Sequence, residues 1–458
     1  MNKDVSHKEA GMSSKISRRS LIKTAGAVGA SAAALKASKA FNAPTVLAQS
    51  GPVKITYWAG FTGQLADAQT QIVKMFNDSQ KDVVVDFQNM KDYETTAQKL
   101  TAALATDTVP DAVLLSDVWW YKFFLNQALV PMNDFISAEK VDLTDYVPSF
   151  INEGKINGEY YWMPFARSTP LFYYNNDMFK AAGLTAAPKT WDELASWAPQ
   201  LLKKDSSGKV QTSVYAHGSG ASYNAWLFQP TVWQYGGAYS DENLKIEINQ
   251  KGAVAAGQMW LDSVNNGWAT APQDNQVDFE NGLTATTLAS TGGLNAVVQA
   301  SKFEVKTAFL PEGPAGFGCC TGGSGLGIIA KAPKERQEAA FKLAAYFSSV
   351  DGTSWWSQHT GYMPVRRSAT GKMADFFAKN PNSKVAVDQL PKTKPQDFAR
   401  TRIPNGDQII GKGLDQILVQ RQAVQGVFDD VAQTLTDAAQ DVLDAIAALP
   451  KPSSTPAS

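Results

Sequence analysis

Val53-Lys54-Ile55-Thr56-Tyr57 alternates apolar and polar residues, and this period of two predicts a β-strand with one buried face. Apolar residues at helical spacing follow over 65–76 and 93–105, and further strand patterns occupy 83–87 and 112–115. Strands and helices that alternate in this way form βαβ units, which build a mostly parallel sheet covered by helices. The stretch therefore predicts an α/β fold.

The rest of the chain continues to mix strands and helices. Leu171–Tyr174 predicts a buried strand, and Thr190–Glu193 is a capping box that begins a helix running to about Leu202. Helical patterns also cover 253–264, 333–348 and, as one long terminal helix, 425–449. No internal repeat or long flexible linker separates these segments, and two lobes joined by more than one chain crossing would explain that absence.

The chain begins with the features of an export signal. A twin arginine, Arg18–Arg19, precedes an apolar residue and a lysine, and a weakly apolar stretch follows over 24–35. That stretch is shorter than the roughly 20 residues that a membrane-spanning helix needs. Small residues at 46–48 supply a cleavage position. We predict a signal peptide over 1–50 and a mature protein in the periplasm, exported by the twin-arginine pathway.

Composition narrows the function classes. Lys and Arg total 42 against 43 Asp and Glu, so no basic excess favours nucleic acid as a partner. The aromatic fraction of 10% includes twelve Trp, which suits ligands with stacking faces. No cluster of His, Cys and carboxylates has metal-ligand spacing, and no nucleophile elbow occurs. We predict no catalytic residue, metal or cofactor, and a secreted enzyme that acts on glycosides stays open as the alternative class.

Cys319 and Cys320 are adjacent and are the only cysteines of the chain. Neither lies at the end of the leader, so neither can carry an N-terminal lipid. Adjacent cysteines can form a strained ring disulfide, but neighbours in a strand point to opposite faces. We expect small buried thiols, with the disulfide as the alternative.

Several short motifs occur in an order that resembles a known family. They are Tyr57-Trp58, Phe165–Asn175, Pro188–Trp191, Gln234–Gly237, Ala289–Gly292, Gly322–Ser324 and His359–Val365. Each motif is weak singly, but their order and spacing over 56–445 are specific. The chain resembles the extracellular solute-binding proteins of ABC importers (family 1), which include maltose-binding and glycerol-3-phosphate-binding proteins.

The resemblance implies a two-lobed fold of the type II periplasmic-binding proteins, with a hinge and a ligand cleft between the lobes. We expect an N-terminal lobe over 52–164 and 303–352, and a C-terminal lobe over 165–302 and 353–450. The family closes its hinge around the ligand and presents the closed form to a membrane permease and its ATPase. We expect a monomer that makes and breaks no bond.

The resemblance to the glycerol-3-phosphate-binding members also implies ligand contacts. The implied positions are Tyr93, Asp117, Ser168, Trp191, Ser290, Gly323 and Tyr362. The arginine that holds the phosphate in those members would fall at Ile410, where an apolar side chain cannot replace a charge-assisted contact. Arg167, Arg400 or Arg402 could supply that charge from another direction. The resemblance thus favours a sugar or glycerol-containing glycoside as ligand, with glycerol-3-phosphate or a glycerophosphodiester as the alternative.

The residue chemistry also favours a sugar. Pyranose rings present C–H faces that stack on aromatic rings, and hydroxyl rims that need donors and acceptors. Candidate stacking residues are Trp58, Trp119, Trp120, Trp226, Trp233 and Tyr362. At most one of Trp119 and Trp120 is expected to face the cleft, because neighbours point in different directions. Arg402 completes the predicted set, and a core position is an equal alternative for Trp191 because it begins a helix.

Overall fold

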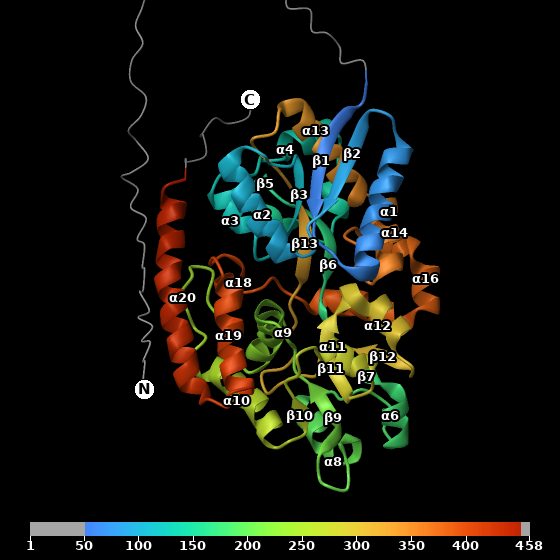
Figure 1. Ribbon diagram of the computed structural model, residues 1–458, viewed down its shortest axis with the longest axis vertical. Coiled ribbons are helices and arrows are strands. Elements are labelled where there is room, and N and C mark those ends of the chain that lie inside the picture. Colours follow the sequence, from blue (N-terminus) through green and yellow to red (C-terminus); the bar gives the residue numbers. More distant parts are fainter. Residues whose placement is uncertain (1–50, 450–458) are drawn as a thin grey trace, which may run out of the picture. The chain divides into compact units, whose positions relative to one another are not determined.

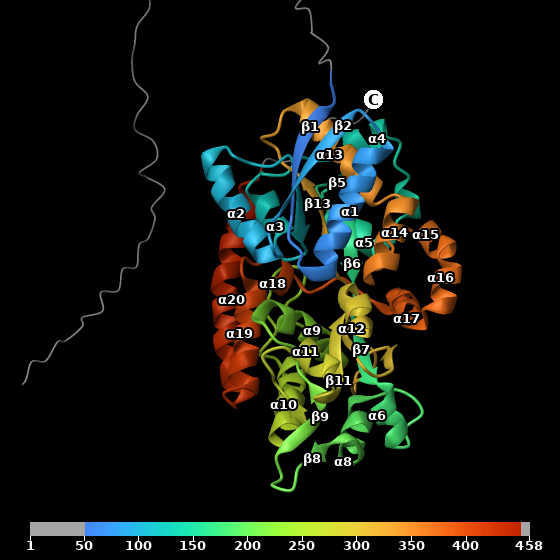
Figure 2. The same ribbon diagram turned by 45° about the vertical axis from the view of Figure 1, so that its right-hand side comes forward.

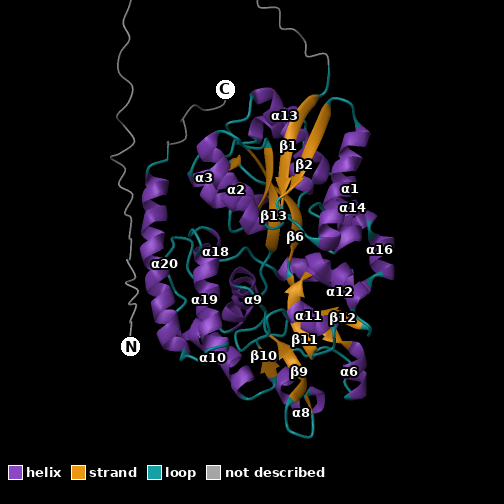
Figure 3. Ribbon diagram, in the orientation of Figure 1, coloured by secondary structure: helices purple, strands orange, loops and turns teal. Residues whose placement is uncertain are grey.

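The computed structural model describes residues 51–449, and Figure 1 shows the path of the chain. The predicted signal peptide over 1–50 lies outside the described residues. Helices and strands are mixed along the chain, and most strands belong to two sheets (Figure 3). Within 51–449, no helix combines the length and the apolar character that crossing a membrane requires.

The first sheet has five strands in the order β2-β1-β3-β13-β6. Their bounds are Val53–Ala59 (β1), Val83–Asn89 (β2), Ala112–Ser116 (β3), Met163–Ser168 (β6) and Gly322–Ile328 (β13). β1 is parallel to β2 and β3, whereas β13 is antiparallel to β3 and β6. The three strands predicted in the opening stretch are confirmed, and so is the parallel start of the sheet.

Helices pack against this sheet through single apolar stripes. α1 (Gly63–Ser79) buries Phe76, and α2 (Tyr93–Thr106) buries Leu100. α2 begins at Asp92, whose carboxylate accepts a hydrogen bond of 2.7 Å from the next turn of backbone. Further helices of this part are α3 (Trp120–Leu125), α4 (Asn133–Ala138), α5 (Pro148–Ile151), α13 (Lys334–Phe347) and α14 (Val350–Thr360).

The second sheet has the order β10-β9-β11-β7-β12, and β8 pairs with β9. The bounds are Pro170–Asn175 (β7), Lys203–Lys204 (β8), Val210–Ala216 (β9), Ala269–Thr270 (β10), Thr284–Ser290 (β11) and Val305–Ala308 (β12). β7 is antiparallel to β11 and β12, while β9 is parallel to β10 and β11. The predicted buried strand over Leu171–Tyr174 is therefore confirmed as β7.

Two of the helices that line the pocket described below pack against each other. α9 (Ala221–Gln234) packs against α19 (Gly406–Leu418), and α19 packs in turn on α20 (Val424–Ala447), as Figure 2 shows. Further helices are α6 (Asn176–Ala181), α7 (Trp191–Ser196), α8 (Ala198–Leu201), α10 (Lys251–Asn265), α11 (Asn275–Glu280), α12 (Leu294–Ala300) and α18 (Phe398–Thr401). The helices predicted over 253–264, 333–348 and 425–449 are confirmed as α10, α13 and α20.

The helix that begins at the predicted capping box is shorter than expected. The hydroxyl of Thr190 accepts from the backbone N–H of Glu193 at 3.1 Å, as predicted, but the Glu193 carboxylate accepts from the N–H of Lys189. The helix ends near Trp197, and Pro199 lies in the first turn of the separate helix α8. Proline has no N–H to donate to the preceding turn, which is why the expected single helix divides here.

The chain divides between the two sheets at places that differ from the expected lobe bounds. We expected the first lobe to resume at 303, but β12 (Val305–Ala308) pairs with β7 and so belongs to the second sheet. The chain returns to the first sheet at β13. The expected bound at 164/165 falls inside β6, and α14, which we assigned mostly to the second lobe, packs on α1, α13 and β6. Strand pairing therefore decides these boundaries, and the sequence pattern does not reveal it.

A buried glutamine ties together segments where the chain passes from one sheet to the other. Gln389 ends α17 (Pro381–Gln389), and its amide nitrogen donates to the Pro170 carbonyl at 2.9 Å and to the Thr169 hydroxyl at 3.2 Å. Its amide oxygen accepts from the N–H of Leu310 at 3.1 Å. The Cys319 thiol lies 3.2 Å from the same amide nitrogen. One carboxamide thus makes hydrogen bonds to two of the segments that connect the sheets.

Cys319 and Cys320 are buried free thiols, as expected. Burial raises the pKa of the Cys319 thiol to about 12, because the thiolate loses its hydration there. A thiol in this state is a poor nucleophile.

Gln389→Leu is expected to lower the free energy of unfolding by about 1–3 kcal/mol, because buried backbone groups of Pro170 and Leu310 lose their partner. Urea unfolding followed by circular dichroism measures this change. The matched control is Gln440→Leu on the exposed face of α20, which should stay within about 0.5 kcal/mol of the wild type. Equal losses for the two variants would contradict the role given to Gln389.

Candidate ligand-binding site

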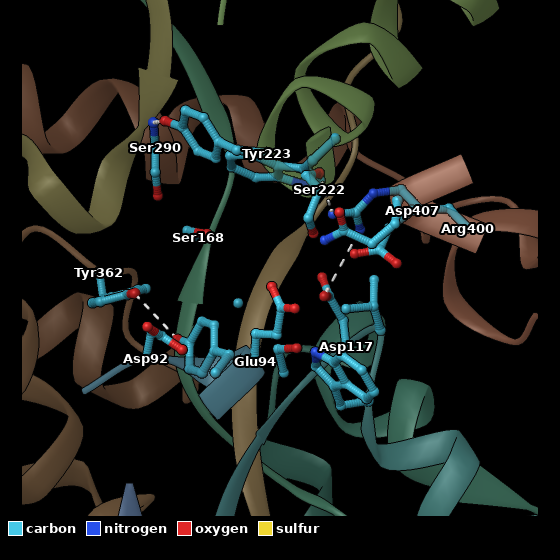
Figure 4. Close-up of a pocket in the computed structure, with 17 residues that line it drawn as sticks. Asp92, Glu94, Asp117, Ser168, Ser222, Tyr223, Ser290, Tyr362, Arg400 and Asp407 are labelled. Carbon is cyan, nitrogen blue, oxygen red and sulfur yellow. Dashed lines mark hydrogen bonds and ion pairs between the residues drawn. The ribbon is translucent and has the colours of Figure 1, made fainter. Parts of the chain in front are cut away.

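A cavity of about 370 Å³ lies where the ends of strands from both sheets meet (Figure 4). It is lined by aromatic rings, hydroxyls and carboxylates, together with one guanidinium. The lining residues are Asp92, Tyr93, Glu94, Ser116, Asp117, Val118, Trp119, Ser168, Ser222, Tyr223, Trp226, Ser290, Gly323, Tyr362, Arg400, Asp407 and Gln408. Among residues 51–449, no group of His, Cys, Asp and Glu is arranged to hold a metal ion.

Three lining residues lie together at one end of the first sheet. The N–H of Asp117 donates to the carbonyl of Gly323 at 3.0 Å, and the register of β13 on β6 sets Gly322 opposite Ser168. Gly323 has a φ of +109°, and a Cβ atom there would lie 2.2 Å from the Ala166 carbonyl oxygen. Glycine is therefore required, and its bare backbone allows a ligand to approach closely.

Phenols and a serine form what we call the hydroxyl end of the cavity: Tyr93, Tyr223, Ser290 and Tyr362. The Tyr93 hydroxyl donates to Ser324 at 3.0 Å and lies 3.4 Å from the Tyr362 hydroxyl, and the Tyr223 hydroxyl accepts from the N–H of Ser290 at 2.7 Å. Burial raises the pKa of the Tyr93 and Tyr362 phenols. These groups are therefore neutral at physiological pH and can both donate to and accept from a hydroxylated ligand.

The opposite side of the cavity, which we call the charged end, consists of Asp117, Arg400 and Asp407. Asp117 Oδ1 lies 3.8 Å from Arg400 Nη1, and both side chains are buried. Arg400 Nη2 donates to the Ser222 carbonyl at 3.0 Å, and Nη1 donates to the amide oxygen of Gln396. Arg400 Nε is enclosed by protein and has no hydrogen-bond partner within the described chain. Arg400 itself lines the cavity, so its guanidinium offers a positive charge to a ligand there.

Three helices begin at this cavity, so the partial positive charges of their first turns meet there. α2 has Asp92 as its N-cap and Glu94 in its first turn, and α19 has Asp407 in its first turn. α9 has neither a side-chain cap nor an acidic residue in its first turn. Its first amide groups, beside Arg400 and Ser222, are the ones left for an anionic group of a ligand.

Eight of the eleven predicted site residues line this cavity. They are Tyr93, Asp117, Trp119, Ser168, Trp226, Ser290, Gly323 and Tyr362. Trp119 faces the cavity while its neighbour Trp120 stacks on Trp162 in the core, so only one of the two tryptophans is available, as predicted. Contact of these eight residues with a ligand stays a prediction.

The structure does not bring the other three predicted residues to the cavity. The indole of Trp58 donates to Gln88 on the neighbouring strand at 3.0 Å. Trp191 is a core residue, 3% exposed, and its indole N–H donates to the Gln234 amide oxygen at 2.7 Å. The guanidinium of Arg402 lies 3.3 Å from the centre of the Phe398 ring, in the wall of a separate, smaller cavity. Each side chain is held by a partner that turns it away from the site.

Of the three arginines that we considered in place of Ile410, only Arg400 lines the cavity. Ile410 is fully buried in the core stripe of α19. The lining residues absent from our prediction are Asp92, Glu94, Ser116, Val118, Ser222, Tyr223, Asp407 and Gln408. The capping pattern at Asp92 could have placed that residue at a helix start, but no local signal marks Ser222 or Asp407.

Comparison with known proteins agrees with this architecture. Residues 71–385 match the family model of the bacterial extracellular solute-binding proteins. A crystal structure of UgpB from Mycobacterium tuberculosis in complex with glycerophosphocholine is 37% identical, covers 86% of this chain and 99% of that chain, and has a TM-score of 0.79. The sn-glycerol-3-phosphate-binding periplasmic protein UgpB of Yersinia pestis is 25% identical over 82% of this chain and 90% of its own length.

A third structure, the cyclic alpha-maltosyl-1,6-maltose binding protein of Arthrobacter globiformis, shares the fold. It is 24% identical, covers 85% of this chain and all of that chain, and has a TM-score of 0.72. The fold is thus that of the two-lobed type II periplasmic-binding proteins, which is the predicted class. The chain belongs to the bacterial extracellular solute-binding proteins, and it is a solute-binding protein of an ABC importer.

A second buried ion pair lies behind the cavity. The guanidinium of Arg167 donates to the carboxylate of Glu153 and lies over the ring of Trp162, 4.8 Å from its centre. Burial raises the pKa of Glu153 to about 7, while the positive charge of Arg167 acts in the opposite direction. Glu153 therefore binds a proton more tightly in the folded protein than in the unfolded chain.

Glu153→Gln is expected to remove a contribution to stability that falls as the pH rises. The unfolded chain ionises Glu153 near its ordinary pKa of 4.5, but the folded protein holds the proton up to about pH 7, so the contribution of Glu153 to the free energy of unfolding falls across that interval. Buried His217, with its pKa lowered to about 3, contributes in the opposite direction. Urea titrations between about pH 5 and about pH 7 measure the slope. The exposed Glu338→Gln should keep the wild-type slope, and an unchanged slope for Glu153→Gln would refute this account.

Proposed function

We propose that this solute-binding protein captures a glycerophosphodiester whose second alcohol is cationic, such as glycerophosphocholine. The single observation that carries the proposal is Arg400, a buried guanidinium that lines the cavity beside the uncapped first turn of α9. A phosphodiester supplies the acceptor oxygens and the negative charge that this corner of the cavity lacks.

The hydroxyl end of the cavity supports a glycerol group on the other side of the phosphate. Tyr93 and Tyr362 offer neutral phenols, and Ser168 and Gly323 line the same cavity. Glycerol hydroxyls need such paired donors and acceptors when they leave water.

The charge balance of the cavity favours a zwitterion over free glycerol-3-phosphate. The lining holds the carboxylates of Asp92, Glu94, Asp117 and Asp407 against the single guanidinium of Arg400. A phosphate monoester brings about −1.5 to −2 charges at neutral pH, whereas a diester with a cationic alcohol brings none in total. The relative from Mycobacterium tuberculosis, whose crystal structure holds glycerophosphocholine, supports the same choice.

A sugar is the second candidate, and the aromatic lining favours it. Trp119, Tyr223 and Trp226 offer faces on which the C–H side of a pyranose can stack. A neutral sugar would bring no negative charge to the Arg400 guanidinium that lines the cavity, so we rank it below the phosphodiester.

The proposed cycle involves no chemistry on the ligand. A ligand that contacts both lobes stabilises the closed form by its differential contact energy, and the membrane permease with its ATPase accepts that form. We propose that the chain does this in the periplasm as a monomer, after export by the twin-arginine pathway. Incubation with glycosides and glycerophosphodiesters, followed by mass spectrometry, should return each compound intact, whereas turnover would favour the rival enzyme.

Isothermal titration calorimetry should show that the mature protein binds glycerophosphocholine more tightly than glycerol-3-phosphate or maltose. Arg400→Met is expected to weaken glycerophosphocholine binding by about 1.5–3 kcal/mol, or roughly 10- to 150-fold, through loss of a charge-assisted contact. Arg402→Met is the matched control and should keep the wild-type affinity, because Arg402 lies outside the cavity.

Two results would contradict the proposal. Maltose binding that exceeds glycerophosphocholine binding and is insensitive to Arg400→Met would establish the sugar candidate. Equal losses in the Arg400 and Arg402 variants would show that the loss comes from destabilisation, so thermal unfolding of each variant without ligand completes the test.

A further inference from the structure

Gln396 stands between the two opposite charges at the charged end of the cavity. Its amide nitrogen donates to Asp117 Oδ2 at 2.5 Å and to the Thr321 carbonyl at 2.9 Å, and its amide oxygen accepts from Arg400 Nη1. The side chain is buried and does not line the cavity itself. The carboxamide therefore uses both of its ends, one on the carboxylate and one on the guanidinium.

Asp117 and Arg400 form an ion pair without a direct hydrogen bond between them. Their nearest charged atoms are 3.8 Å apart, whereas a direct charge-assisted hydrogen bond is about 2.8 Å long and an arginine–carboxylate pair is commonly bidentate. A bidentate pair would turn the guanidinium toward Asp117 and occupy two of its N–H donors.

We infer that Gln396 is a positioning residue, which holds Arg400 apart from Asp117 so that the Arg400 guanidinium stays available to the ligand. The inference that this guanidinium receives a phosphate rests on the proposed function. The separation of the two charges by Gln396 does not, and the two can be tested apart.

The crystal structure of the unliganded Gln396→Met variant tests the separation directly. Methionine keeps the length of the side chain but removes both hydrogen bonds, so the Arg400 guanidinium should move from 3.8 Å to about 2.8 Å from the Asp117 carboxylate. A separation that remains near 3.8 Å would overturn the inference. This readout needs no ligand, so a failure of glycerophosphocholine to bind the wild type would refute the proposed function alone.

Binding by the same variant measures the consequence. Gln396→Met should weaken glycerophosphocholine binding about tenfold or more, because the ligand must then compete with Asp117 for the guanidinium. The matched control is Gln69→Met, a fully buried glutamine on α1 outside the cavity, which should leave the affinity unchanged. Wild-type affinity in the Gln396→Met variant would contradict the inference.

Gln396→Glu adds a pH readout that a merely structural role would not produce. A protonated glutamate, like glutamine, offers one donor and one acceptor, whereas an ionised one repels Asp117 and pairs with Arg400. The loss of affinity relative to wild type should therefore shrink as the pH falls from about 8 to about 5, across the range in which a carboxyl beside another carboxylate titrates. A loss that is constant over this range would overturn the inference.

Wild-type protein measured at each pH corrects for other titrating groups near this position. The titratable and charged side chains that line the two cavities beside Gln396 are Asp92, Tyr93, Glu94, Asp117, Tyr121, Glu153, Tyr223, Glu242, Tyr362, Arg400, Arg402 and Asp407. All are present in both proteins, so their common effect cancels in the ratio of affinities.

Discussion

The structure depends on a buried guanidinium that its neighbours stabilise without neutralising fully. Removing such a charge from water costs several kcal/mol, and the fold offsets this through the Ser222 carbonyl, the Gln396 carboxamide and the Asp117 carboxylate at 3.8 Å. Arg400 also lines the cavity, so its charge is presented to a ligand. A pocket built only for neutral sugars has no need of this charge, which is why it carries the proposal of a phosphodiester ligand.

The architecture explains how remote segments supply the parts of this arrangement. Ser222 and Arg400 are 178 residues apart, yet α9 and α18 bring them into contact beside Asp117, which follows β3 of the first sheet. The crossings between the two sheets are packed around Gln389, whose carboxamide serves the Pro170 and Leu310 backbone. The cavity is therefore lined by residues attached to both sheets, and a ligand that contacts both would meet the physical requirement for coupling binding to lobe closure.

Local patterns in the sequence predicted the elements well and the long-range geometry only in part. Alternation and helical spacing identified β1 to β3 and their helices. Eight of the site residues predicted from the family resemblance and the residue chemistry line one cavity. The sequence could not show that Trp191 is held in the core by Gln234, or that β12 pairs with the second sheet. It also could not choose Arg400 as the cation in place of Ile410, because that choice depends on how α18 and α19 are placed.

A crystal structure of the protein grown with glycerophosphocholine would show which groups hold the phosphate. The phosphate oxygens should lie within hydrogen-bond distance of the Arg400 guanidinium and of the first amide groups of α9, with the glycerol at the hydroxyl end. A phosphate bound away from Arg400, or a cavity that stays without the ligand at saturating concentration, would contradict the proposed function.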